Sequence, residues 1–150
     1  MDNNKIFNGK FILVIEDSPF DQMVMKNALS KHGCIIQTAG DGITALDKIR
    51  MEKFDLIFTD MYLPKLSGME VAQKIRNTDN PNRQTPIIAI TGEEYEEAMI
   101  DIIKASGVDK YLMKPVHERE LLEIITFLLN NQNTLGNRKS STTTGYNPVV

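Results

Sequence analysis

The sequence has a single cysteine, no tryptophan and no long apolar run. Cys34 excludes a disulfide within the chain and favours a reducing compartment. No apolar run is long enough to span a bilayer, and the polar start MDNNKIFNGK is unlike a signal peptide. These absences argue against a secreted or membrane-spanning protein. We therefore expect a soluble cytoplasmic domain.

Positive charge is not concentrated anywhere in the chain. The sequence has 17 Lys and Arg against 20 Asp and Glu, a formal net charge of -3, and no long basic block. Because nucleic-acid-binding domains gather basic residues into patches, we expect neither a nucleic acid nor a membrane as partner. His32 and His117 have no second His or Cys nearby at metal-binding spacing, which argues against a transition-metal site.

Short apolar segments alternate with segments of helical periodicity along most of the chain. The predicted strands cover 10–17, 34–39, 54–60, 85–91 and 108–113, and the predicted helices cover 18–33, 41–53, 67–78, 93–107 and 117–130. Because these strands are apolar throughout rather than alternating, the sheet should be parallel and covered by helices on both faces. The sequence therefore predicts an α/β fold with a doubly wound, five-stranded parallel sheet and five helices.

Composition divides the 150 residues into three parts. Residues 1–9 form a polar N-terminal lead, 10–130 one domain, and 131–150 a polar segment that we interpret as a disordered tail or linker. The tail is too short and too polar to fold as a DNA-binding unit. The sequence leaves open whether the domain stands alone or is excised from a longer protein.

Local signals mark the starts of two predicted helices. Ser18 is placed to act as an N-cap, with Pro19 at the first turn, where a missing N–H costs nothing. Ser67 and Glu70 have the spacing of a capping box.

Polar side chains stand at the carboxyl ends of four predicted strands. Glu16 and Asp17 follow the first strand, Asp60 ends the third, Thr91 ends the fourth, and Lys114 follows the fifth. In a parallel sheet these ends meet at one edge, so we expect the side chains to converge. Two unit charges ~4 Å apart interact by about 4 kcal/mol at an effective dielectric of 20, so three clustered carboxylates require a cation. Oxygen ligands on loops suit Mg²⁺, or Mn²⁺ in its place, shared with a phosphoryl group.

A phosphoryl group would give a role to each remaining side chain. The Lys114 ammonium can hold a carboxylate or phosphoryl oxygen, and the Thr91 hydroxyl can donate a hydrogen bond to one. Asp60 is then the group that can attack phosphorus, as carboxylates do when they form aspartyl phosphates. Phosphoryl transfer needs mainly positioning and charge stabilisation, which explains a carboxylate held at the end of a buried strand.

This set of residues, in this order and on these elements, resembles the receiver domain of two-component response regulators over roughly residues 10–130. The resemblance implies the flavodoxin-like strand order 2-1-3-4-5. It also implies roles for individual residues: Asp60 as phosphoacceptor, Asp17 as direct Mg²⁺ ligand, Glu16 as an acid acting through water, the backbone carbonyl of Tyr62 as third protein ligand, Thr91 as switch hydroxyl, Lys114 as phosphate-binding lysine, Pro115 as a proline after a cis bond, and Tyr111 as switch aromatic.

The function implied by this resemblance is a phosphorylation-dependent signalling switch. Asp60 would accept a phosphoryl group from the phosphohistidine of a histidine kinase or histidine phosphotransfer protein, with a possible downstream protein target. Thr91 would then move inward, Tyr111 would rotate, and the surface of the fourth helix, fifth strand and fifth helix would shift. Such a receiver catalyses only its own phosphorylation and dephosphorylation. For Tyr111, simple packing against the fourth helix is the alternative.

Several segments resemble a subtype of this family. The loop NTDNPNRQ (77–84) and the stretch EDSPFDQ are similar to receivers of hybrid histidine kinases and phosphorelays. We expect Phe20, Met23 and Pro115 to dock the helical phosphodonor, although chance exposure of Phe20 is the alternative. Tyr62 and Glu93 flank the expected path of hydrolytic water, so they should tune the lifetime of the phosphoryl group.

Two rival functions conflict with particular residues. A haloacid-dehalogenase-type phosphatase needs a second acid two positions after its aspartate nucleophile, where this chain has Tyr62. A flavodoxin-type electron carrier needs a hydroxyl- and glycine-rich phosphate loop after the first strand. The acids Glu16 and Asp17 at that position would repel the FMN phosphate.

Overall fold

The computed structural model describes residues 6–131. The elements in chain order are β1 (Phe11–Ile15), α1 (Pro19–Ser30), β2 (Ile35–Ala39), α2 (Gly42–Met51), β3 (Leu56–Asp60), α3 (Gly68–Asn77), β4 (Ile87–Thr91), α4 (Glu97–Ala105), β5 (Lys110–Met113) and α5 (Glu118–Asn130). All neighbouring strands pair in parallel, in the order β2-β1-β3-β4-β5. The predicted fold class and strand order are confirmed.

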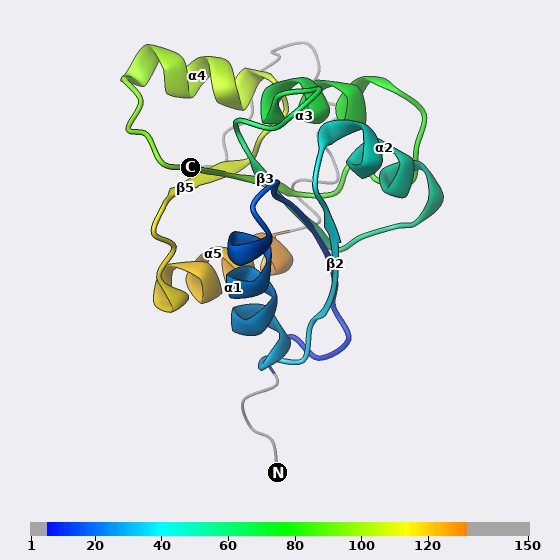
Figure 1. The fold of residues 1–150 in the computed structure, drawn as a ribbon, viewed down its shortest axis with the longest axis vertical. Coiled ribbons are helices and arrows are strands. Elements are labelled where there is room, and N and C mark those ends of the chain that lie inside the picture. Colours follow the sequence, from blue (N-terminus) through cyan, green and yellow to red (C-terminus); the bar gives the residue numbers. More distant parts are fainter. Residues whose placement is uncertain (1–5, 132–150) are drawn as a thin grey trace.

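Helices cover both faces of the sheet, with α1 and α5 on one side and α2, α3 and α4 on the other (Figure 1). Successive strand side chains point to opposite faces, so each strand contributes to two cores. In β3, Phe58 packs with α1 and α5, whereas its neighbour Ile57 packs with α2, α3 and α4. Burying one large aliphatic or aromatic side chain stabilises the folded state by roughly 1.5–3 kcal/mol. Because every residue of β3 and β4 is buried, these central strands contribute strongly to the stability of the sheet.

The register of the sheet determines which side chains meet at its carboxyl edge. Ile15 of β1 pairs with Thr59 of β3, so the next residues, Glu16 and Asp60, lie at neighbouring positions. On the other side of β3, Asp60 pairs with Ile90, which places Thr91 one residue further along β4.

Both predicted helix caps are confirmed. The Ser18 hydroxyl accepts a hydrogen bond from the Asp21 N–H at 3.2 Å, and Pro19 occupies the first helical turn. Ser67 and Glu70 form a reciprocal capping box, with side-chain to backbone distances of 2.8 and 3.1 Å. These bonds satisfy N–H groups that the first helical turn leaves without a backbone partner.

The predicted start of the fourth helix at residue 93 is wrong. α4 begins at Glu97, and its N-cap, Glu96, makes no side-chain capping bond. The segment before it is held by tertiary contacts, because the Tyr95 hydroxyl bonds to Thr91 and Tyr62. These contacts outweigh the helix propensity of a glutamate-rich segment.

The chain before β1 contributes to the core, which its polar composition did not indicate. Phe7 is buried against the α1 and α5 side of the sheet, and its N–H donates to the carbonyl of His32 at 3.0 Å. The proposed tail lies outside the described residues, apart from Asn131. No helix between residues 6 and 131 has both the length and the apolar character needed to cross a bilayer.

The polar loop 77–84 is organised around one buried side chain, Asn82. Its Oδ1 accepts hydrogen bonds from the Phe54 N–H at 2.7 Å and from the Thr85 hydroxyl at 3.0 Å. Its Nδ2 donates to the carbonyls of Glu52 at 2.6 Å and Ile49 at 2.8 Å. A side-chain amide therefore ties this loop to the end of α2 and the start of β3.

Candidate functional site

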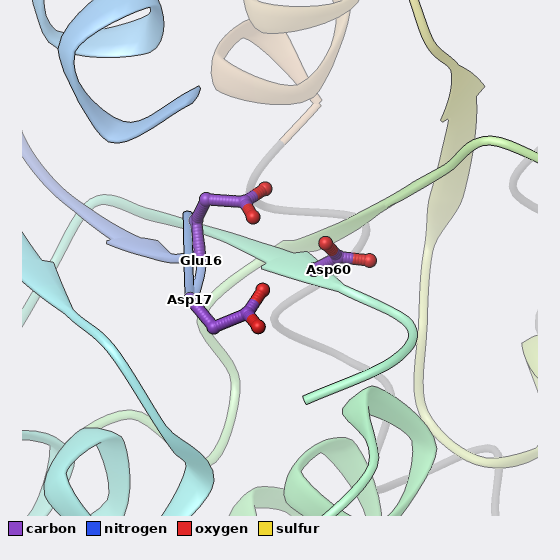
Figure 2. Close-up of side chains that lie close together, drawn as sticks. All are labelled: Glu16, Asp17 and Asp60. Carbon is purple, nitrogen blue, oxygen red and sulfur yellow. The ribbon is translucent and has the colours of Figure 1, made fainter. Parts of the chain in front are cut away.

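Three carboxylates converge at the carboxyl edge of the sheet. Glu16, Asp17 and Asp60 each offer an oxygen, and these three oxygens lie within 4.8 Å of one another. Figure 2 shows the side chains reaching toward one region, Glu16 and Asp17 from the end of β1 and Asp60 from the end of β3. Glu16 and Asp60 are buried, whereas Asp17 is exposed. The predicted acidic cluster is therefore assembled by the fold.

Lys114 bridges the two buried acids. Its Nζ donates to Glu16 Oε1 at 3.1 Å, to Asp60 Oδ2 at 3.1 Å and to Asp21 Oδ2 at 3.3 Å. Burial alone lowers the pKa of the ammonium, but the hydrogen bonds and charges of Asp60 and Glu16 outweigh burial and raise the pKa above its usual value. Lys114 is therefore held in its charged form.

The pKa of Glu16 shows the electrostatic cost of this cluster. Burial raises the pKa, and the nearby charge of Asp60 raises it further. The Ser18 N–H, 3.1 Å from Glu16 Oε2, and Lys114 act in the opposite direction without cancelling the rise. A cation shared by these acids would relieve the repulsion between them.

The donor atoms of the cluster fit Mg²⁺ or Mn²⁺. The three carboxylates are hard oxygen ligands at or just after the ends of β1 and β3, and oxygen is the ligand type these ions prefer. The Tyr62 N–H donates to Asp60 Oδ1 at 3.2 Å, so the backbone at Tyr62 lies beside the Asp60 carboxylate. Coordination by the Tyr62 carbonyl stays a prediction.

A chain of hydrogen bonds joins the loop after β3 to the loop after β4. The Thr91 hydroxyl lies 3.1 Å from the Tyr95 hydroxyl, which donates to the Tyr62 hydroxyl at 3.2 Å. Tyr62 donates in turn to Glu93 Oε1 at 3.2 Å, and the Glu93 N–H donates to Thr91 Oγ1 at 3.1 Å. The hydrogen bond to Tyr95 is the main cause that raises the pKa of Tyr62 to about 12, with further contributions from loss of hydration, the charge of Tyr95 and the interactions with Glu93. Both predicted lifetime-tuning residues belong to this chain.

The remaining predicted residues lie on β5 and just after it. The Tyr111 ring packs edge-on against Tyr95, in the loop before α4, with centroids 6.3 Å apart. Both the switch role and packing against α4 itself stay predictions. The peptide bond between Lys114 and Pro115 is cis, as the resemblance implied.

The residues predicted for docking lie on or near one groove beside the acidic cluster. Phe20 and Pro115 line a cavity of about 380 Å³ that extends to Glu16 and Lys114. Phe20 is 66% exposed and Met23 is 51% exposed. The groove is lined by the next helical residues, Val24 and Met25, rather than by Met23.

Sequence reasoning missed two residues that contact the site. Asp21 lies in the first turn of α1, just after the acids that follow β1, and this place in the sequence could have indicated it. Tyr95 lies in the glutamate-rich start of the segment predicted as the fourth helix, and its contacts depend on the tertiary arrangement of two loops.

Comparisons with known proteins agree with this geometry. The family model of the response regulator receiver domain matches residues 12–126. The chain is 27% identical over 147 residues to a probable histidine kinase 2 from Oryza sativa subsp. japonica, covering 88% of this chain and 14% of that protein. It is 33% identical over 113 residues to the autoinducer 2 sensor kinase/phosphatase LuxQ from Vibrio vulnificus, covering 75% of this chain and 13% of that protein.

A solved structure gives a closer match in length. The receiver domain of a sensor histidine kinase from Pseudomonas aeruginosa PAO1 shares 31% identity, with a TM-score of 0.74. The match covers 81% of this chain and 98% of that domain, whose structure has a magnesium ion coordinated in its active-site cleft. The first curated relatives are much longer proteins, of which the chain spans 8% to 19%.

Proposed function

The chain belongs to the response regulator receiver family, and from this premise we propose that Asp60 accepts a phosphoryl group from a partner's phosphohistidine. The observation that carries the proposal is the convergence of Glu16, Asp17 and Asp60 with the ammonium of Lys114. Members of this family act as signalling switches in two-component systems. We take residues 10–130 as the receiver unit, with Phe7 adding to its core.

Asp60 is better placed than Asp17 to act as the nucleophile. It ends a fully buried strand, and its carboxylate is oriented by the Tyr62 N–H on Oδ1 and by Lys114 on Oδ2. Asp17 is exposed, which suits a ligand that shares a hydrated ion. A rigidly aimed carboxylate supplies the positioning on which phosphoryl transfer mainly depends.

The transfer forms one bond and breaks another. An Asp60 carboxylate oxygen bonds to phosphorus while the bond from phosphorus to the donor's imidazole nitrogen breaks, and that nitrogen keeps the electron pair. The imidazole, protonated on its other nitrogen, leaves neutral. Bound Mg²⁺, held by Glu16, Asp17 and Asp60, would neutralise charge on the phosphoryl oxygens. Lys114 and Thr91 would each contact one of those oxygens.

The groove beside the site supports docking of a helical phosphodonor. Phe20 and Val24 present apolar side chains next to the acids, and Pro115 lines the same groove. An exposed apolar strip bordering a phosphoacceptor fits the helix that carries a phosphohistidine. We propose a histidine kinase or a histidine phosphotransfer protein as the partner, and transmission of the signal through α4, β5 and α5. A cytoplasmic location agrees with such a phosphodonor and with the single cysteine.

The direct test uses a small phosphodonor. Incubation with acetyl phosphate and Mg²⁺, followed by intact mass measurement, should show one phosphoryl adduct. The adduct should be absent in Asp60→Asn and when a chelator removes the metal. Asp101→Asn, which changes an exposed aspartate on α4, is the matched control and should retain the adduct. An adduct that persists in Asp60→Asn would place the chemistry on another residue.

A further inference from the structure

Tyr95 occupies the centre of the hydrogen-bond chain beside the phosphoacceptor. Its hydroxyl contacts Thr91 Oγ1 at 3.1 Å on one side and the Tyr62 hydroxyl at 3.2 Å on the other. Its ring packs edge-on against Tyr111. A single side chain therefore touches the predicted switch hydroxyl, the loop after β3 and the predicted switch aromatic.

The direction of each hydrogen bond follows from the proton inventory. The Glu93 carboxylate only accepts when ionised, so the Tyr62 hydroxyl donates its proton to it. The Tyr95 hydroxyl has one proton, which it donates to Tyr62. Tyr95 can then act only as acceptor toward Thr91. The single hydroxyl proton of Thr91 is therefore directed at Tyr95.

This arrangement conflicts with the role expected of Thr91 after phosphorylation. A threonine hydroxyl can donate only one hydrogen bond, so donation to a phosphoryl oxygen requires release of Tyr95. Thr91 is fully buried, and the Glu93 N–H already occupies one acceptor position on its oxygen. The two donation targets thus compete for the same proton.

We propose that Tyr95 is a positioning residue that holds the Thr91 proton in the unphosphorylated state and thereby opposes phosphoryl binding. The inference rests on the proposed function, because it requires Asp60 to carry the phosphoryl group. Movement of the Tyr95 hydroxyl away from Thr91 would also alter its hydrogen bond to Tyr62, which joins this residue to the loop after β3. The start of α4, two residues after Tyr95, is the element that this release would move.

A double-mutant cycle tests the inference with beryllofluoride as the phosphoryl analogue. Calorimetric titration in Mg²⁺ would compare wild type, Tyr95→Phe, Thr91→Ala and the double variant. Tyr95→Phe keeps the ring packing on Tyr111 but removes the acceptor for Thr91. We expect Tyr95→Phe to bind the analogue roughly two- to tenfold more tightly, as loss of one competing hydrogen bond predicts.

The Thr91→Ala background separates this role from a purely structural one. With no Thr91 hydroxyl to hold, Tyr95→Phe should leave analogue affinity unchanged. Weaker or equal binding by Tyr95→Phe alone, or the same gain in the Thr91→Ala background, would overturn the inference. If wild type fails to bind the analogue, or Asp60→Asn binds it equally well, the proposed function itself fails.

Discussion

The ammonium of Lys114 lies 3.1 Å from Asp60 Oδ2 and 3.1 Å from Glu16 Oε1, so one cation joins the carboxyl ends of β1 and β3. Both acids are buried, and each would otherwise hold a negative charge away from solvent. The side chain that is expected to bind phosphate after phosphorylation therefore also stabilises the site before it.

The first prediction concerns removal of this cation. Lys114→Met should lower the free energy of unfolding in the absence of divalent metal by about 1–3 kcal/mol, since two buried acids lose a charged hydrogen-bond partner. Urea unfolding with a chelator would measure the loss, and added Mg²⁺ should recover part of it. Lys26→Met, at an exposed position of α1, should change stability much less. Equal stability of the two variants would contradict this role of Lys114.

A second prediction concerns the pH dependence of stability at the opposite end of α1. His32 and then Lys31 form hydrogen bonds with Glu118 and hold the pKa of its carboxyl below its usual value of 4.5. A lowered carboxyl pKa contributes stability that is present above pH 4.5 and is lost as pH falls through the folded-state pKa.

Glu118→Gln should therefore lose stability relative to wild type at neutral pH, and the difference should shrink in acid. Urea unfolding at a series of pH values would measure it. Glu120→Gln, also in the first turn of α5, should follow the wild-type pH profile. A constant difference between Glu118→Gln and wild type at all pH values would show that the contribution is not electrostatic.

A third prediction concerns the buried amide of Asn82. Asn82→Ala leaves two backbone carbonyls, the Phe54 N–H and the Thr85 hydroxyl without this partner, so it should cost about 2–4 kcal/mol. Denaturant unfolding would measure the loss. Asn27→Ala, on an exposed position of α1, should be close to neutral. A small effect of Asn82→Ala would mean that water replaces the amide.

The fourth prediction tests the docking groove. Phe20→Ala should slow phosphoryl transfer from a cognate phosphohistidine protein by roughly tenfold, which corresponds to loss of one apolar anchor of an interface. Phosphorylation by acetyl phosphate should be unaffected, because the small donor does not use the groove. Met51→Ala removes a side chain that is 80% exposed at the end of α2 and serves as the control. If Phe20→Ala accepts the phosphoryl group as fast as wild type, the exposed Phe20 side chain does not take part in docking.

Part of the site could be predicted because it depends on short-range order in the sequence. Asp60 follows an apolar strand, Ser18 precedes Pro19, and Ser67 stands three residues before Glu70; each pattern is readable without a partner segment. The acids and Lys114 could be placed together because parallel strands present their carboxyl ends at one edge. The strand order itself came from resemblance to a family.

Sequence alone determined the alternation of strands and helices, the acids at the strand ends and the caps, since each depends on neighbouring residues and on periodicity. Only the tertiary structure decided that Tyr95 lies before α4 with its hydroxyl against Thr91, that Asp21 contacts Lys114, and that Phe7 is part of the core. The contacts of Asp21 and Phe7 join segments far apart in the chain, and the position of Tyr95 depends on contacts between the loop after β4 and the loop after β3. Local propensity carries no information about which distant group will satisfy a side chain.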